Sequence, residues 1–169
     1  MTALDEFRRE KDSLFAASPD SPLTPEQQEH FHGLSYFPED PSLRMEIEVT
    51  RFPDQEQIKL PTSTGDIQTY TRYGRLSFEV DGKTAELTLF GSPQGYFLPF
   101  VDSQAGKKTY GAGRYLDPER LPNGTFLIDF NLAYNPYCAY NENWNCPIPP
   151  AENHLDVAIR AGEKNFDAH

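Results

Sequence analysis

The residues with the widest chemical range are two cysteines, Cys138 and Cys146, which lie eight positions apart in a segment rich in tyrosine, asparagine and proline. A thiolate is a nucleophile and a soft metal ligand, and paired thiols can exchange with disulfides. Metal binding or thiol-redox chemistry through this pair is therefore one alternative function. Structural zinc sites favour a shorter spacing between paired cysteines, so two structural thiols are the simpler interpretation.

A second alternative is a hydrolase-type enzyme. Its candidate catalytic residues are Asp129, Cys138 and Glu152, with Arg114 holding the substrate. A cysteine nucleophile needs a base, which His154 could supply if the loop between them folds back. Asp129 and Glu152 could instead pair as an acid and a base, since two carboxylates in different surroundings can divide those roles.

Residues 109–115 read Thr-Tyr-Gly-Ala-Gly-Arg-Tyr, and the two glycines allow a close approach of the backbone to a ligand or to another strand. The segment is not a dinucleotide-binding motif, because it has no third glycine at the right spacing and no helix pattern follows. One interpretation is a bend that needs glycine. The other is an anion site, since the planar guanidinium of Arg114 suits carboxylate or phosphate.

The stretch from Asp129 to Asn153 contains a long loop, 131–153, with many aromatic side chains. Long loops in compact domains are usually functional or disordered, and the available rings argue against disorder. The loop is predicted to be a lid over a ligand site or a clamp on the C-terminal strand. The first functional hypothesis is a β-barrel domain that binds a small molecule, which could be anionic. A competing hypothesis is a structural module without a ligand. The predicted ligand-binding residues are Arg72, Tyr110, Arg114, Tyr115, Asp129, Asn131, Tyr134 and Asn135.

Length and charge limit the other possibilities. A chain of 169 residues fits a single domain, 1–169, and its formal net charge of −11 argues against a nucleic-acid partner. No apolar run approaches the ~18 residues of a membrane span, and the N-terminus does not resemble a signal peptide. We therefore expect a cytoplasmic protein with reduced thiols. The sequence indicates no particular cofactor and no oligomeric state.

The elements that would position these residues begin with a helical segment, 1–37. Thr2 is predicted to cap a helix over 3–16, and Thr24 is predicted to cap a second helix that ends at Gly33. One or two short N-terminal helices are therefore expected ahead of the strands.

A β domain is predicted over 43–163, because the apolar residues there recur with a period of two. Asp81-Gly82 is typical of a type I′ hairpin turn. The fold class is therefore mainly β (α+β), an antiparallel β-barrel or sandwich-like meander. The predicted strands are 45–49, 58–60, 67–73, 76–80, 85–89, 96–101, 126–130 and 155–159.

Three motifs together resemble the DUF1684 family of uncharacterised bacterial and archaeal proteins. They are Tyr-Gly-Ala-Gly-Arg-Tyr at 110–115, the run 130–140 with Asn-Pro-Tyr-Cys-Ala-Tyr, and Cys-Pro-Ile-Pro-Pro-Ala-Glu-Asn at 146–153. Ala-Gly-Glu at 161–163 fits the same family, and the resemblance covers nearly the whole chain. It implies that the segment is one characteristic unit and implies no activity. His154 is outside the family pattern, which weakens the zinc and Cys–His hypotheses.

Overall fold

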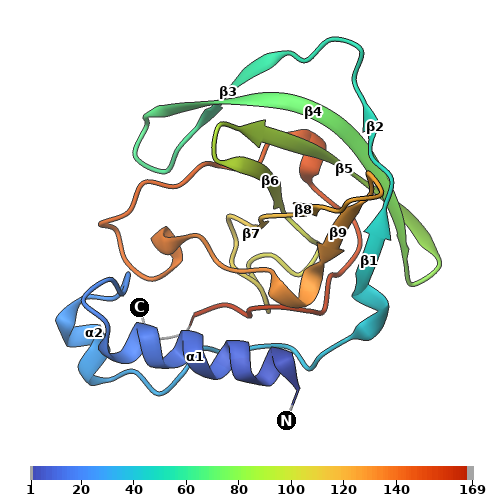
Figure 1. Ribbon diagram of the computed structural model, residues 1–169. Coiled ribbons are helices and arrows are strands. Elements are labelled where there is room, and N and C mark those ends of the chain that lie inside the picture. The colour runs from blue at the N-terminus through green and yellow to red at the C-terminus, as the bar shows by residue number, and fades with distance from the viewer. Residues whose placement is uncertain (1, 167–169) are drawn as a thin grey trace.

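The computed structural model describes residues 2–166 of the chain (Figure 1). It contains the helices α1 (Ala3–Ala17) and α2 (Pro25–Glu29) and the short 3-10 helices η1 (Pro41–Leu43), η2 (Phe130–Leu132), η3 (Tyr137–Ala139) and η4 (Ala151–Asn153). The strands are β1 (Arg44–Ile47), β2 (Thr50–Arg51), β3 (Gln57–Pro61), β4 (Ile67–Val80), β5 (Lys83–Ser92), β6 (Gly95–Phe100), β7 (Arg114–Leu116), β8 (Glu119–Arg120) and β9 (Phe126–Asp129).

Both N-terminal helices begin at the predicted caps. The side chains of Thr2 and Thr24 each accept a hydrogen bond from the backbone N–H three residues later, and each helix start is a complete capping box. The first helix matches the prediction to within one residue. The second helix is shorter than predicted, because it ends at Glu29 rather than continuing to Gly33.

The strands form two antiparallel sheets. The larger sheet has the order β2-β4-β5-β6-β7, with β3 also paired to β4, and the smaller has the order β1-β9-β8. The predicted strands 67–73 and 76–80 are one continuous strand, β4, whose register against β5 shifts between Arg72 and Gly74. Asp81 and Gly82 have φ of 51° and 78°, as the predicted hairpin turn requires.

A core between the two sheets holds them together. Leu87 from β5 and Leu98 from β6 pack with Phe126 and Ile128 from β9 in one buried cluster. Over residues 2–166 the sheets remain separate and do not close into a barrel. Of the two predicted architectures, the sandwich-like meander is therefore confirmed, and the closed barrel is wrong.

The predicted strand 155–159 is also wrong. Val157, Ala158 and Ile159 are all buried, so burial does not alternate as in a strand, and the backbone of this segment has other partners. The N–H of Ile159 donates to the carboxylate of Asp102 at 2.8 Å, and the carbonyl of Val157 accepts from Ser103. A side-chain acceptor therefore replaces the regular ladder that a strand would need.

The first helix is attached to the rest of the protein by an ion pair. Lys11 of α1 pairs with the carboxylate of Glu163, which is buried and also accepts hydrogen bonds from the Tyr140 hydroxyl at 2.8 Å and the Asn135 N–H at 3.1 Å. In Figure 1, α1 lies along the base with the orange and red C-terminal segments between it and the large sheet. Glu163 therefore joins the helix to the start of the loop 131–153.

None of the helices within residues 2–166 is long and apolar enough to cross a lipid bilayer.

Candidate functional site

A cavity of about 470 Å³ lies where three distant parts of the chain meet. These parts are the turn between β3 and β4, the glycine segment 110–115, and the loop 136–148. Two of the three were singled out from the sequence. The residues that line the cavity are Ser63, Thr64, Tyr110, Ala112, Tyr115, Pro136, Cys138, Glu142, Trp144, Cys146, Pro147 and Ile148.

The two cysteines lie together in the wall of this cavity. The backbone N–H of Cys138 donates a hydrogen bond to Sγ of Cys146 at 3.3 Å. Both are free thiols. Cys146 is buried against the ring cluster of Phe90, Phe97 and Tyr115, whereas Cys138 is half-buried.

The hydrogen bonds around the pair make Cys138 the more acidic thiol. The bond from the Cys146 thiol lowers the pKa of Cys138 to about 6, against the opposing effect of burial, and the Tyr110 and Ser63 hydroxyls add to the lowering. The pKa of Cys146 is raised, first because its proton is held on the Cys138 sulfur and then because it is buried. Cys138 is therefore the sulfur that carries a negative charge near neutral pH.

Tyr110 completes the polar surroundings of Cys138. Its hydroxyl lies 3.8 Å from Sγ of Cys138, within hydrogen-bond range of sulfur. Burial, followed by the charge of Cys138, raises the pKa of Tyr110 to about 12. The phenol therefore stays protonated at neutral pH and can donate to the thiolate.

Tyr115 also lines the cavity. Its hydroxyl donates to the carbonyl of Pro147, and its ring packs edge-on against Phe97 and Tyr134. Burial raises the pKa of Tyr115, so the hydroxyl remains a donor. This bond ties strand β7 to the residue that follows Cys146, which holds the loop in place over the sheet.

The glycine segment allows this close packing. Gly113 has φ of 101°, and a β-carbon there would lie 2.6 Å from the carbonyl oxygen of Phe100 and 3.0 Å from a ring atom of Pro149. Both the backbone conformation and the space therefore require glycine. The structure contains the glycine-dependent bend, which leads directly into β7.

Arg114 does not face the cavity, and the predicted anion site at this residue is wrong. The side chain is 1% exposed, and its guanidinium donates to the carbonyls of Ile159, Ala161 and Glu163 at 2.9, 2.5 and 3.0 Å. Burial lowers its pKa to about 10, although the Asp102 carboxylate 3.8 Å away opposes that effect. Its donors are used to hold the C-terminal segment, and none is directed at a ligand.

Asp129 and Asn131 form a separate group at the end of β9 and in η2, away from the cysteine cavity. Asp129 accepts from the N–H of Asn131 at 3.0 Å and pairs with Arg44 at 3.7 Å. The Asn131 amide exchanges two hydrogen bonds with the backbone of Asp40. These contacts cap η2 and attach it to the chain before β1, so neither residue lies at the cysteine cavity.

Tyr134 and Asn135 lie at the start of the loop. The Tyr134 hydroxyl donates to Asp117 at 2.7 Å, and its backbone pairs with Tyr115. The Asn135 side chain donates to the carbonyl of Lys164. Tyr134 also borders a hollow of about 370 Å³ that adjoins the cysteine cavity and shares Trp144 and Cys146 with it.

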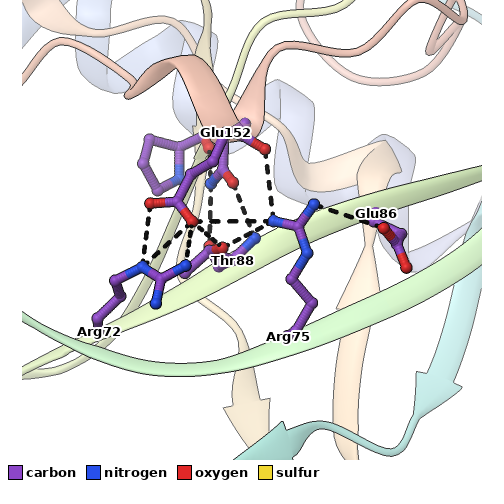
Figure 2. Close-up of polar contacts among 7 residues, drawn as sticks. Arg72, Arg75, Glu86, Thr88 and Glu152 are labelled. Carbon is purple, nitrogen blue, oxygen red and sulfur yellow. Dashed lines mark hydrogen bonds and ion pairs between the residues drawn. The ribbon is translucent and has the colours of Figure 1, made fainter. Parts of the chain in front are cut away.

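Arg72 and Glu152 form an ion pair beside the larger sheet and do not line the cysteine cavity (Figure 2). The guanidinium of Arg72 makes two-point contact with the Glu152 carboxylate, the shortest distance being 2.6 Å, and the Thr88 hydroxyl donates to the same carboxylate at 2.6 Å. The hydrogen bond from Arg72 lowers the pKa of Glu152, and the same bond raises the pKa of Arg72. Arg75 bridges this pair to Glu86 at the rim.

Asn153 shows what this ion pair stabilises. Its buried amide bonds the backbone N–H and carbonyl of Thr88 and the carbonyl of Pro99. The end of the long loop, η4, is thus inserted against β5 and β6. The predicted clamp on a C-terminal strand is wrong, because no strand forms at 155–159. The clamp that is present holds the end of the loop on the larger sheet, and Arg72 and Glu152 belong to it rather than to the cavity.

The three candidate catalytic residues therefore do not meet. Asp129 lines a different hollow of about 250 Å³, Cys138 lines the cysteine cavity, and Glu152 is engaged with Arg72. His154 is exposed, and its backbone bridges to Val101. Within residues 2–166 no group of three metal-ligating side chains occurs, so the predicted Cys138–Cys146 metal site has no further ligand there.

Several residues of the cavity were not predicted from the sequence patterns. Ser63 and Thr64 lie about 80 positions before the loop, and the Ser63 hydroxyl accepts from the N–H of Cys146 at 3.1 Å. A polar turn gives no sign of such a distant contact. Trp144 and Ile148 lay within the predicted loop, and their apolar character among polar neighbours was the available signal.

The chain belongs to the family described as "Protein of unknown function (DUF1684)", which matches residues 29–164. Among solved structures, it is similar to the solution NMR structure of an uncharacterized protein from Haloarcula marismortui, with 40% sequence identity and a TM-score of 0.72. That alignment covers 98% of this chain and 94% of the other. A search of curated proteins gave no match. The resemblance identified from the sequence motifs is therefore confirmed, and it extends over the whole site.

Proposed function

We propose that this protein binds an uncharged or cationic small molecule in the cavity around Cys138 and Cys146. The observation that carries the proposal is the convergence of three separate chain segments on one hollow of about 470 Å³. Ligand sites are typically concave and mostly apolar, with a few polar groups at fixed positions. The cavity has this mixture, with the rings of Tyr110, Tyr115 and Trp144 beside the hydroxyls of Ser63 and Thr64.

The charge of the lining supports the choice of ligand class. The residues lining the cavity, all in the described part of the chain, include Glu142 and no lysine or arginine. A thiolate at Cys138 adds a second negative charge. An anion would therefore enter without a counter-charge, which is costly in a partly buried site, whereas rings attract cations and neutral apolar groups. The anionic ligands expected from Arg114 are not part of this proposal.

The hydrolase alternative has less support, since the two carboxylates proposed for it lie elsewhere. We retain the cytoplasmic setting within the proposal, because a pair of thiols stays reduced there. No cofactor and no macromolecular partner is included.

Trp144 provides a direct test, because it is the one tryptophan in the sequence and lines the cavity. Its fluorescence should be titrated with N-phenyl-1-naphthylamine, which is neutral, and with 1-anilinonaphthalene-8-sulfonate, which has similar rings and a negative charge. We expect the neutral dye to quench Trp144 and the sulfonate to bind about tenfold more weakly, even in salt that screens the net charge of the protein.

A matched pair of variants locates the binding. Ala112 and Ala16 are both exposed, and of the two Ala112 lies at the cavity rim. Ala112→Phe should weaken the neutral dye at least about fivefold by narrowing the entrance, and Ala16→Phe should leave it unchanged. The proposal would be wrong if neither dye altered Trp144, or if Ala112→Phe bound the neutral dye as well as the wild type does.

A further inference from the structure

The cysteine pair has an asymmetry that simple ligand binding does not need. Both cysteines line the cavity, but Cys138 is half-buried, whereas Cys146 is buried in the ring cluster. In dithiol exchange, one sulfur must be reachable by a substrate and the other must be reachable by the first. The positions of Cys138 and Cys146 in the wall meet both conditions.

We infer that Cys138 and Cys146 form a dithiol–disulfide couple that exchanges with small disulfides or thiols bound in the cavity. This inference rests on the proposed function, since the cavity is where the substrate would bind. It assigns a substrate class, an uncharged low-molecular-weight disulfide, and it gives each cysteine a distinct role.

The reaction would proceed in two balanced steps. The Cys138 thiolate attacks one sulfur of the disulfide RSSR, forming a Cys138–S–S–R bond and releasing RS⁻. The Cys146 thiol loses its proton to the released thiolate and attacks Sγ of Cys138, which expels the second RS⁻. The second RS⁻ takes its proton from water, which received the proton that Cys138 lost on forming its thiolate. The net result is one protein disulfide and two RSH, so the dithiol loses two electrons and RSSR gains them.

The local contacts favour the first step at Cys138. Its sulfur faces the hydroxyl of Tyr110 at 3.8 Å, and the Cys146 and Ser63 side chains also favour its charged form. These donors stabilise a thiolate, which is the nucleophilic form. A sulfur without such donors would remain protonated and would react slowly at neutral pH.

The second step starts from neighbouring groups. Sγ of Cys146 accepts a hydrogen bond from the backbone N–H of Cys138 itself, at 3.3 Å. A disulfide requires the two sulfurs to approach to ~2.05 Å, and the backbone of one cysteine already contacts the sulfur of the other.

The test uses the whole protein and bis(2-hydroxyethyl) disulfide, a small neutral substrate. Reduced wild type should release two equivalents of 2-mercaptoethanol, end two hydrogens lighter, and carry no adduct. Cys146→Ser should release one equivalent and retain one hydroxyethylthio group on Cys138. Cys138→Ser should react at least about tenfold more slowly, because the remaining thiol is buried and less acidic. Circular dichroism checks the fold, and Cys146→Ala replaces Cys146→Ser if the serine variant does not fold.

Two results would overturn the inference. One is wild-type protein that keeps an adduct on both cysteines, and the other is a Cys138→Ser variant that reacts as fast as the wild type. Dye binding separates this failure from failure of the proposed function. If Trp144 still responds to the neutral dye while exchange fails, only the dithiol role is wrong. If the dye does not bind, the proposed ligand site is wrong as well.

Discussion

The N–H of Cys138 donates to Sγ of Cys146 at 3.3 Å, which places two thiols eight positions apart in one cavity wall. The intervening residues include Trp144, whose indole N–H donates to the carbonyl of Pro22 at 2.8 Å. The loop between the cysteines is thus fixed at both the cavity and the helical segment. The two thiols are thereby held at defined positions, which the proposed site requires.

The pH dependence of alkylation should report the acidity of Cys138. Because only the thiolate reacts, the rate of carboxamidomethylation by iodoacetamide should rise with pH and level off above a midpoint of about 6. Cys146→Ala removes the principal hydrogen bond and should move the midpoint upward, toward that of an ordinary thiol. Tyr110→Phe should move it in the same direction by less. A wild-type midpoint near ~8.5, the value of a free cysteine, would contradict this account.

Much of the fold could be predicted from the sequence because it is encoded locally. Thr2 and Thr24 bond backbone groups three residues away, and Asp81-Gly82 adopts the turn that only such residues favour. The error at 155–159 has a non-local cause, since an alternating sequence pattern is the same whether the backbone bonds another strand or the Asp102 side chain.

The candidate site was predicted less well, for the same physical reason. The sequence identified Cys138, Cys146, Tyr110 and Tyr115 as part of one region, and they do line one cavity. It could not reveal that Arg114 binds carbonyls some 45 positions later, because a free guanidinium and an engaged one have the same local sequence.

Arg114→Lys should destabilise the fold rather than alter ligand charge preference. Lysine keeps the charge but cannot donate to three carbonyls from one planar group, so buried acceptors would lose partners. We expect a loss of about 2–4 kcal/mol in the free energy of unfolding, measured by urea denaturation. Arg120→Lys, at an exposed position, should change it by less than about 0.5 kcal/mol. A stable Arg114→Lys protein with altered dye selectivity would show that the residue faces a ligand after all.

Comparing the unfolding free energies of Gly113→Ala and Gly124→Ala separates the cost of backbone strain from the cost of steric crowding. Both glycines have positive φ, 101° and 88°, so both substitutions should cost about 1–2 kcal/mol in unfolding free energy. At Gly113 the new methyl group would also meet Phe100 and Pro149, whereas nothing lies within 4 Å at Gly124. Gly113→Ala should therefore cost about 1–3 kcal/mol more and disturb dye binding. Equal losses in the two variants would show that the close approach at Gly113 is absent.

Glu152→Gln tests the clamp shown in Figure 2. This substitution removes the charge that Arg72 and Thr88 contact. It should lower the free energy of unfolding at pH 7 by about 1–2 kcal/mol, measured by urea denaturation. Because the folded-state pKa of Glu152 is lowered, its stabilisation is complete above the unfolded pKa of about 4.3 and is lost as pH falls through the folded value. The gap in unfolding free energy between wild type and variant should therefore begin to narrow below the unfolded pKa and close below the folded pKa.

The control for this prediction is the glutamate-to-glutamine substitution at the exposed residue Glu86. Glu86 contacts Arg75 at 3.6 Å and is 57% exposed, so Glu86→Gln should cost less than about 0.5 kcal/mol at any pH. If the two variants lost stability equally, or if the Glu152→Gln gap persisted in acid, the ion pair would not be what holds η4 on the sheet.

The location of a bound small molecule tests the central claim most directly. Amide and indole chemical shifts of the isotope-labelled, reduced protein should be followed by NMR during titration with N-phenyl-1-naphthylamine. We predict that the largest shifts occur at Trp144, Cys138 and Tyr110, around the cysteine cavity. Shifts confined to another hollow, such as the one lined by Tyr73 and Tyr96, with Trp144 unaffected, would contradict the proposed site.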